Sequence, residues 1–282
     1  MPEGDTIYRS ARALNKTLSG KPVTRFETAY AKLATVNDDR VVVGRVVEKV
    51  ESRGKWLLMY LSGDLILVTH MLMSGSWHIY RTGEKWWLPH SAMRILIEVE
   101  GWQAVAFNVP VAEFHTADSL ARRSNVPKLG PDILSPSYTA QAGAERLIER
   151  ARTHPEDEIA NVLLNQRVIA GLGNVYKSEV CFAAKVHPFR KMSTITSDEA
   201  MQIADIAQRY MTANVLDGAD GGIVTYSGPR RTTHAGQGEE RLWVYRRRGH
   251  ECRRCGTAIE MRKQGAGARS TYWCPQCQPR ID

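Results

Sequence analysis

The stretch from Cys252 to Cys277, CRRCGTAIEMRKQGAGARSTYWCPQC, holds four of the five cysteines and decides how the C-terminal end folds. The cysteines form two Cys-x2-Cys pairs, and eighteen residues separate the pairs. Two thiolates at that spacing reach one tetrahedral metal ion, and two such pairs complete a closed four-cysteine site. Two disulfide bonds are the alternative, but the spacing suits zinc. The pattern therefore predicts one structural zinc ion, with these ligands: Cys252, Cys255, Cys274 and Cys277.

The residues between the two pairs have room for a β-hairpin with Gly265-Ala266-Gly267 at its tip. The surrounding segment carries most of the positive charge. Between Pro229 and Arg280 there are twelve Lys and Arg residues against four Asp and Glu, and the net charge of the whole chain is +8. A solvated charged face is the usual explanation of such a run. A one-sided excess in the C-terminal fifth nevertheless favours nucleic acid as the partner.

Upstream of the cysteines the apolar residues follow a helical period. The expected helices span Ala140–Thr153, Glu156–Asn165, Tyr176–Ala184 and Ser197–Leu216. The fifth cysteine, Cys181, lies in an apolar helical segment and is expected to be a buried core residue. Between two of these helices, Gly171-Leu172-Gly173-Asn174 permits a tight turn whose backbone N–H groups can approach a phosphate. A plain helix connection is the commoner role of such a turn.

The N-terminal half reads as one helix followed by strands. Asp5–Leu18 has helical spacing and ends at Gly20-Lys21-Pro22, a stop signal. The strand-like runs between Val23 and Phe114 lie at 41–43, 56–59, 65–68, 95–97 and 105–107. The expected fold is α+β, with four parts: an N-terminal β-sandwich with its helix (1–122), a linker (123–137), a helical domain (138–245) and a four-cysteine zinc finger (246–282).

The first residues, Met1-Pro2-Glu3-Gly4-Asp5-Thr6, suggest chemistry rather than structure. If Met1 is removed, Pro2 presents a secondary amine, which forms a permanently cationic iminium when it attacks a carbonyl-like carbon. The carboxylate of Glu3 beside it can shuttle protons. A frayed terminus without a role is the alternative.

Nothing in the chain predicts a secretory signal or a membrane span. Met1 leads into a polar segment rather than an apolar core, and Ser62, Gly63, Asp64 and His70 interrupt the longest apolar stretch, Trp56 to Met73. The expectation is a cytoplasmic protein without a membrane partner.

Together these motifs resemble the formamidopyrimidine-DNA glycosylase and endonuclease VIII family of base-excision repair enzymes. Six ordered matches carry the resemblance: Pro2-Glu3-Gly4, Arg53-Gly54-Lys55, His70 to Gly75, Leu129 to Asp132, Gly171 to Tyr176 in what looks like the helix–two-turns–helix motif, and Leu242 to Tyr245 leading to the cysteines. The resemblance implies a bifunctional glycosylase and AP lyase acting on double-stranded DNA with oxidised bases or abasic sites. A monomer is the expected state.

The resemblance also implies roles for single residues. Pro2 would attack C1′ of a flipped-out nucleotide, and Glu3 would donate a proton. Lys55 would assist β-elimination, and Arg269 would support δ-elimination and hold phosphates. A further set of DNA contacts comprises His70 and Asn174 on the backbone and Met73 in the gap left by the flipped base. Taken singly, Lys55 could be a surface lysine, His70 a satisfied core histidine and Met73 ordinary core.

Departures from the family pattern bear on the substrate. The purine-specific branch has an arginine-containing stretch before the linker, and Phe107 to Phe114 contains no arginine here. That favours oxidised pyrimidines, although His70 to Gly75 is closer to the purine branch. Thr6 stands where the family often has a second glutamate. Two alternatives stay open: the same chemistry on 8-oxoguanine and formamidopyrimidine, and a non-catalytic zinc-finger DNA-binding protein.

Overall fold

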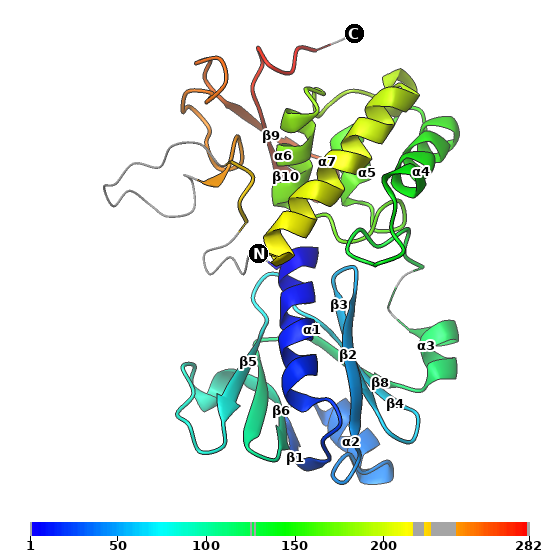
Figure 1. The fold of residues 1–282 in the computed structure, drawn as a ribbon, viewed down its shortest axis with the longest axis vertical. Coiled ribbons are helices and arrows are strands. Elements are labelled where there is room, and N and C mark those ends of the chain that lie inside the picture. The colour runs from blue at the N-terminus through cyan, green and yellow to red at the C-terminus, as the bar shows by residue number, and fades with distance from the viewer. Residues whose placement is uncertain (1, 125, 127, 217–222, 227–240, 281–282) are drawn as a thin grey trace. The chain divides into compact units, whose positions relative to one another are not determined.

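The chain divides into an N-terminal unit, Met1–Pro127, and a C-terminal unit, Lys128–Asp282 (Figure 1). The computed structural model describes residues 2–124, 126, 128–216, 223–226 and 241–280. Each unit encloses its own apolar core.

Two four-stranded antiparallel sheets form the N-terminal unit, so the predicted β-sandwich is confirmed. One sheet runs in the order β1 (Val23–Thr28), β6 (Met93–Val99), β7 (Trp102–Phe107), β5 (Ser76–Arg81). The other runs β2 (Val47–Arg53), β3 (Trp56–Leu61), β4 (Leu65–His70), β8 (Val111–His115). Alternate residues of facing strands, such as Leu57 and Met59 on β3 and Ile95 and Ile97 on β6, share the core cluster.

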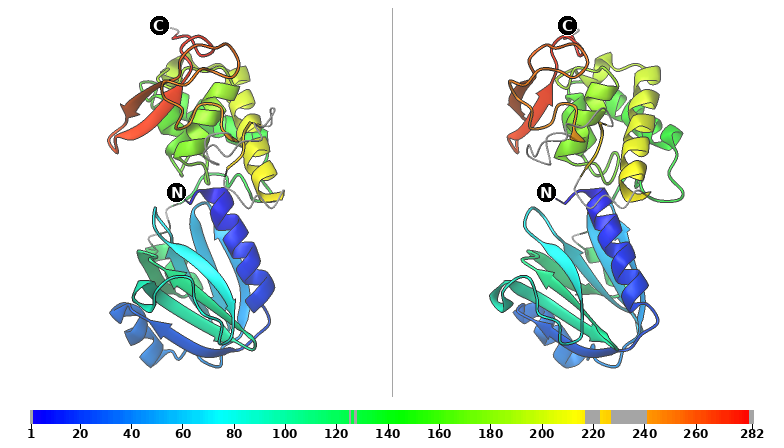
Figure 2. Two further views of the ribbon diagram at one scale, coloured as in Figure 1. Left: turned by 90° about the vertical axis from the view of Figure 1, so that its left-hand side faces the viewer. Right: turned by 60° about the vertical axis from the view of Figure 1, so that its left-hand side comes forward.

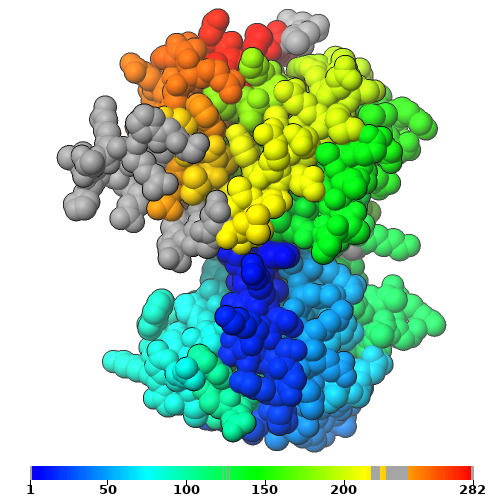
Figure 3. All heavy atoms as spheres, in the orientation of Figure 1, coloured from blue at the N-terminus to red at the C-terminus, as the bar shows by residue number. Residues whose placement is uncertain are grey.

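Helix α1 (Gly4–Leu18) packs on this sandwich, and Figure 3 shows its outer face in dark blue on the surface. Its buried side chains recur at helical spacing, at Ile7, Ala11, Leu14 and Leu18. Two polar contacts fix it to β2: the Val50 N–H donates to Asn15 Oδ1 at 2.7 Å, and the Ser19 hydroxyl donates to the Glu48 carbonyl at 2.9 Å.

The strand expected at Val41–Val43 is absent, and this prediction was wrong. The segment is a turn after a short helix, α2 (Ala31–Asp39), in a region we expected to be strands throughout. Only Val42 is buried, with its N–H bound to Asn37 Oδ1, whereas Val41 and Val43 are 56% and 47% exposed. Three β-branched residues thus fill a turn, because tertiary packing overrides strand propensity. Another short helix, α3 (Ala117–Arg123), follows β8.

In the part of the C-terminal unit that the structure describes, the α-helices are α4 (Ala140–Thr153), α5 (Ile159–Leu164), α6 (Asn174–Ala183) and α7 (Ser197–Leu216). Their apolar faces, together with Ile133 and Tyr138, form one core. Helix α5 is shorter than expected because Glu158 pairs with Lys191 in a β-bridge, and the Ile159 N–H donates to the Arg190 carbonyl. Cys181 is completely buried, as predicted, and burial raises the pKa of its thiol to about 12, with Lys177 opposing the shift.

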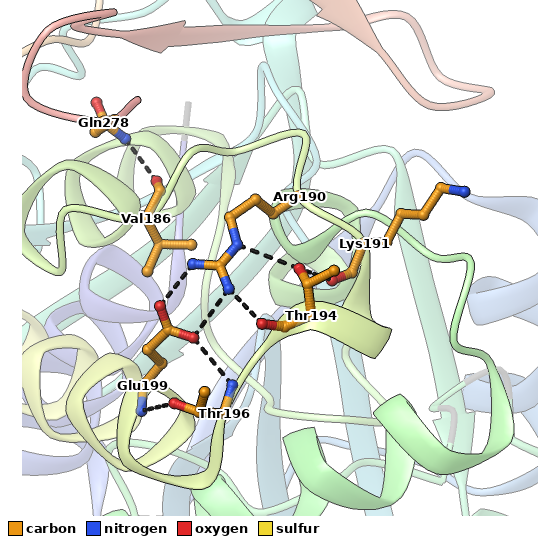
Figure 4. A network of polar contacts seen from close by, with 7 residues as sticks. All are labelled: Val186, Arg190, Lys191, Thr194, Thr196, Glu199 and Gln278. Atoms are coloured by element: carbon orange, nitrogen blue, oxygen red, sulfur yellow. Dashed lines mark hydrogen bonds and ion pairs between the residues drawn. The ribbon is translucent and has the colours of Figure 1, made fainter. Parts of the chain in front are cut away.

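A buried arginine holds the loop between α6 and α7, as Figure 4 shows. The Arg190 guanidinium donates to both carboxylate oxygens of Glu199 and to the Thr194 carbonyl. Glu199 in turn accepts the Thr196 N–H at the start of α7. In the same view the Gln278 amide, at the end of the chain, donates to the Val186 carbonyl at 2.8 Å. The loop between α6 and α7 is therefore fixed both to the helical core and to the four-cysteine segment, residues 246–280, which we call the cysteine module.

The cysteine module contains a β-hairpin, β9 (Glu260–Gln264) and β10 (Arg269–Trp273), as predicted. Figure 2 shows the hairpin in red beside the green helices of the same unit, and β10 packs on α6. Across the residues that the structure describes, every helix is too short or too polar to cross a membrane.

Candidate active site

The predicted site residues of the N-terminal unit converge because α1 and β2 run in opposite directions. Asn15 lies beside Val50. From there the helix rises about 1.5 Å per residue back to Glu3, about 18 Å, and the strand rises about 3.4 Å per residue on to Lys55, about 17 Å. The start of the helix and the β2–β3 turn therefore lie at the same end of the unit, as Figure 1 shows.

Pro2 and Glu3 lie where α1 begins. Pro2 is half-buried, and Glu3 is the N-cap with an extended backbone at φ −115°. The Glu3 side chain is buried and caps no helix N–H, whereas its backbone carbonyl accepts the Ile7 N–H at 3.1 Å. The helix thus fixes the backbone beside Pro2.

Lys55 lies in a two-residue hairpin turn. Arg53 pairs with Trp56, so that Gly54 and Lys55 alone connect β2 to β3. Gly54 has φ +58°, a left-handed conformation that glycine adopts without steric cost. The tight turn leaves the half-buried Lys55 little freedom in its backbone position.

His70 is paired in register with Trp56, so it lies next to Lys55. Burial lowers the pKa of His70, and the Lys55 charge lowers it further. The Leu72 N–H points at Nδ1 at 3.0 Å, so Nδ1 accepts, and the ring proton is assigned to Nε2. A neutral imidazole with an Nε2–H is a hydrogen-bond donor suited to a phosphate oxygen.

The turn after His70 presents two apolar side chains to solvent. Met71 is buried, whereas Leu72 is 49% and Met73 67% exposed. Gly75 closes the turn by donating its N–H to the Met71 carbonyl at 2.8 Å. A Cβ on Gly75 would lie 2.9 Å from the Val109 Cα, so only glycine fits. We predicted Met73 alone from the sequence. Leu72 was missed because its exposure depends on a left-handed backbone, φ +46°.

The connection from β7 to β8 lies against that turn and contains no arginine. It comprises Asn108, Val109 and Pro110. Val109 is buried, and its carbonyl accepts the Tyr30 hydroxyl. Asn108 and Pro110 are exposed. The connection offers no cationic side chain to DNA.

In the C-terminal unit the structure brings Asn174 to the finger hairpin. Asn174 begins α6, and its amide donates to the Ser270 carbonyl at 3.1 Å and to the Tyr245 hydroxyl at 3.4 Å. Arg269, the neighbour of Ser270, is exposed. Both amide hydrogens have protein partners, so a phosphate contact by Asn174 requires one of them to change partner.

A buried carboxylate that we did not single out in the sequence supports the same region. Glu179 on α6 is completely buried and accepts the N–H groups of Trp243, Val244 and Tyr245 at 2.8–2.9 Å, and the Thr225 hydroxyl. The Glu179 side chain thus holds residues 243–245, the segment that leads into the cysteine module. Its position five residues after Asn174 did not indicate this role, because its hydrogen-bond partners are far away along the chain.

The four finger cysteines gather as predicted, with all Sγ atoms within 4.8 Å of one another. Sγ of Cys252 lies 3.9 Å from that of Cys277, and Sγ of Cys255 lies 3.4 Å from that of Cys274. Disulfide sulfurs are about 2.05 Å apart, whereas the edges of a zinc tetrathiolate are about 3.8 Å, from Zn–S bonds of about 2.3 Å. The arrangement therefore fits a tetrahedral metal, and zinc suits four thiolates.

Comparisons with known proteins cover both units. The model of the formamidopyrimidine-DNA glycosylase N-terminal domain matches residues 1–110, that of its H2TH domain residues 129–225, and a zinc finger found in FPG and IleRS residues 249–280. "Probable endonuclease 8 2" of Streptomyces coelicolor is 35% identical, covering 99% of this chain and 94% of the relative. "DNA-(apurinic or apyrimidinic site) lyase Nei2" of Mycolicibacterium smegmatis is 34% identical, covering 99% of both chains.

A solved structure agrees with the fold. Lactococcus lactis formamidopyrimidine-DNA glycosylase, non-covalently bound to DNA containing an AP site, matches with a TM-score of 0.80 and 21% identity, covering 99% of this chain and 100% of that one. With sequence relatives that span its whole length and family models that match all three of its modules, the chain belongs to the formamidopyrimidine-DNA glycosylase and endonuclease VIII family.

Proposed function

We propose that this DNA glycosylase and abasic-site lyase acts through a Schiff base on Pro2. Once Met1 is removed, the Pro2 nitrogen attacks C1′, and the bond to the damaged base breaks as the new C–N bond forms. Glu3 supplies a proton to the sugar ring or the leaving base. The observation that carries the proposal is the convergence of Pro2, Glu3, Lys55 and His70 at one end of the N-terminal unit.

The iminium then makes strand cleavage possible. It acidifies the C2′ proton, so a modest base, assisted by Lys55, suffices for β-elimination of the 3′ phosphate. The 5′ phosphate then leaves in a second elimination, the δ-elimination, which Arg269 supports. Hydrolysis of the iminium finally releases Pro2. The protein residues carry out every step, and the zinc ion would hold the finger that presents Arg269.

Binding to double-stranded DNA would use both units. His70, with its proton on Nε2, donates to a backbone phosphate. Asn174 gives up its longer hydrogen bond, to Tyr245, in exchange for another phosphate. Met73 and Leu72 fill the gap left by the flipped nucleotide. We propose a monomeric, cytoplasmic enzyme with one structural zinc ion.

Oxidised pyrimidines are the substrates we propose. The support is the β7–β8 connection, whose exposed residues are Asn108 and Pro110 and which carries no arginine toward the strand opposite the lesion. The relatives at 34–35% identity include proteins named endonuclease 8 2, and "Endonuclease 8" of Pectobacterium atrosepticum and "Formamidopyrimidine-DNA glycosylase" of Bacillus cereus are both 30% identical.

A cleavage panel tests the proposal. Matched duplexes carry thymine glycol, dihydrouracil, 8-oxoguanine or an abasic site, and single-turnover rates are compared for wild type, Lys55→Ala and Glu3→Gln. The proposal expects faster cleavage of the pyrimidine lesions and slower cleavage by both variants. Preference for 8-oxoguanine would overturn the substrate assignment alone. Tight binding without any cleavage would favour the non-catalytic alternative.

A further inference from the structure

The hairpin that carries Arg269 is held by a buried glutamine. Gln264, the last residue of β9, is 4% exposed and lies directly across the hairpin from Arg269. Its Nε2 donates to Glu158 Oε2 at 2.7 Å and to the Pro188 carbonyl at 3.1 Å. Its Oε1 accepts the Thr271 hydroxyl at 2.7 Å. Three bonds from one amide therefore connect both strands of the hairpin to the helical part of the unit.

The hairpin tip borders a cavity on the side of Glu158. The cavity has a volume of about 420 Å³, and Glu158, Gln264 and Arg269 line it together with the apolar Val162 and Leu164. Close packing exists at one point, where a Cβ on Gly265 would lie 2.7 Å from Asn161 Oδ1. The same Asn161 donates its amide to Glu158 Oε2 at 3.2 Å. Polar contacts through Glu158, to Gln264 and to Asn161, therefore hold the tip at the edge of this cavity.

Contacts on β10 hold the next residues independently. The Ser270 carbonyl accepts from Asn174, and the Tyr272 N–H donates to the Ser178 hydroxyl at 3.3 Å. These contacts fix β10 to α6. The turn between β9 and β10, with Arg269 at its end, is held instead by the hydrogen bonds of Gln264. Displacing an exposed side chain by about 1 Å is enough to weaken a contact to a phosphate.

We infer that Glu158 and Gln264 are positioning residues for Arg269, and that their hydrogen bond sets the efficiency of the second, δ-elimination step. Arg269 touches DNA in the function proposed above, on which this inference rests. Glu158 and Gln264 act through the backbone of the hairpin, because Gln264 pairs with Arg269 in register. Glu158 lies outside the finger, at the N-cap of α5, so it can be changed without altering any residue of the cysteine module itself.

The test uses the full-length enzyme with its zinc and compares Glu158→Ala, Glu158→Gln, Gln264→Ala and Arg269→Ala. The substrate is a duplex with a preformed abasic site, and gels separate the β- from the β,δ-elimination product. Glu158→Ala should slow the second step by about tenfold to a hundredfold, the equivalent of one hydrogen bond to a charged group. The first step and the zinc content should stay at wild-type values. Gln141→Ala, which breaks an exposed glutamine–glutamate contact on α4, is the matched control.

Two further readouts separate positioning from general loss of structure. Glu158→Gln keeps an acceptor oxygen and should restore the wild-type product ratio. The salt dependence of binding in Glu158→Ala should flatten toward that of Arg269→Ala, by up to about 0.9 in log–log slope for one phosphate contact. The double variant Glu158→Ala/Gln264→Ala should be no worse than the more affected single variant.

A wild-type product ratio and salt slope in Glu158→Ala would overturn the inference. Equal loss of δ-elimination in Glu158→Gln and Glu158→Ala would also overturn it. The negative charge of Glu158, rather than its hydrogen bond to Gln264, would then control that step. Failure of the proposed function gives a different result: the wild-type enzyme itself would cleave no abasic duplex.

Discussion

Replacing the buried carboxylate of Glu179 by an amide should destabilise the C-terminal unit strongly. The two oxygens accept four hydrogen bonds, three from backbone N–H groups and one from Thr225. In Glu179→Gln the NH2 group can donate to the Thr225 hydroxyl, which also accepts, so the bond that is lost is the one from the Trp243 N–H. A hydrogen bond to a charged group contributes about 1.5–3 kcal/mol, so the loss should be at least about 1.5 kcal/mol.

Thermal unfolding measures this loss. For a unit of this size 1 kcal/mol corresponds to about 2–4 °C, so the melting temperature of the C-terminal unit should fall by at least about 3 °C. Glu145→Gln is the control, because Glu145 lies exposed on α4 and accepts only the Gln141 amide among the described contacts. Its effect should stay within about 0.5 kcal/mol. A Glu179→Gln protein that melts within 1 °C of wild type, about the error of the assay, would refute the role assigned to the carboxylate.

Three other changes have defined outcomes. Gly75→Ala places a Cβ 2.8 Å from the Met71 carbonyl, so urea unfolding should show a loss of about 1–3 kcal/mol, and lesion cleavage should slow; an unchanged midpoint would count against the turn geometry. Burial alone would raise the pKa of Glu199, but its bonds to Arg190 hold it below its usual value, so stability should fall as the pH drops through the folded pKa. Glu199→Gln should flatten that acid limb, and an equally steep limb would contradict the assignment. Cys274→Ser should release the metal, measured by a colorimetric zinc assay, and abolish strand cleavage; full cleavage after complete chelation would show that the finger is dispensable.

Much of the fold could be predicted because local patterns and final packing agree. The helical spacing of Ile7, Ala11, Leu14 and Leu18 matches the buried face of α1, and the boundaries of α4 and α7 agree with the expected ones. The cysteine spacing predicted the cluster of thiols, because two residues between ligands leave little choice of geometry. The strand predicted at Val41–Val43 is absent, because three β-branched residues favour a strand only where a neighbouring strand is available.

The supporting contacts of the site could not be predicted. Glu179 and Glu158 are ordinary glutamates in the sequence, and the partners that give them their roles are distant: Thr225 is 46 residues from Glu179, and Gln264 is 106 residues from Glu158. Nothing in the sequence around Leu72 predicted its left-handed backbone conformation. The residues with recognisable chemistry, such as Pro2 and Lys55, are short-range motifs, whereas the residues that hold them in place are defined only by tertiary contacts.

Borohydride trapping followed by peptide mass mapping tests the central claim most directly. Intact mass first establishes that Met1 has been removed, and the enzyme is then reduced in the presence of a duplex with an abasic site. The account predicts one DNA adduct, located on the nitrogen of Pro2 and lost when an additional residue precedes it. An adduct on a lysine instead, or undiminished trapping when Met1 is retained, would contradict it.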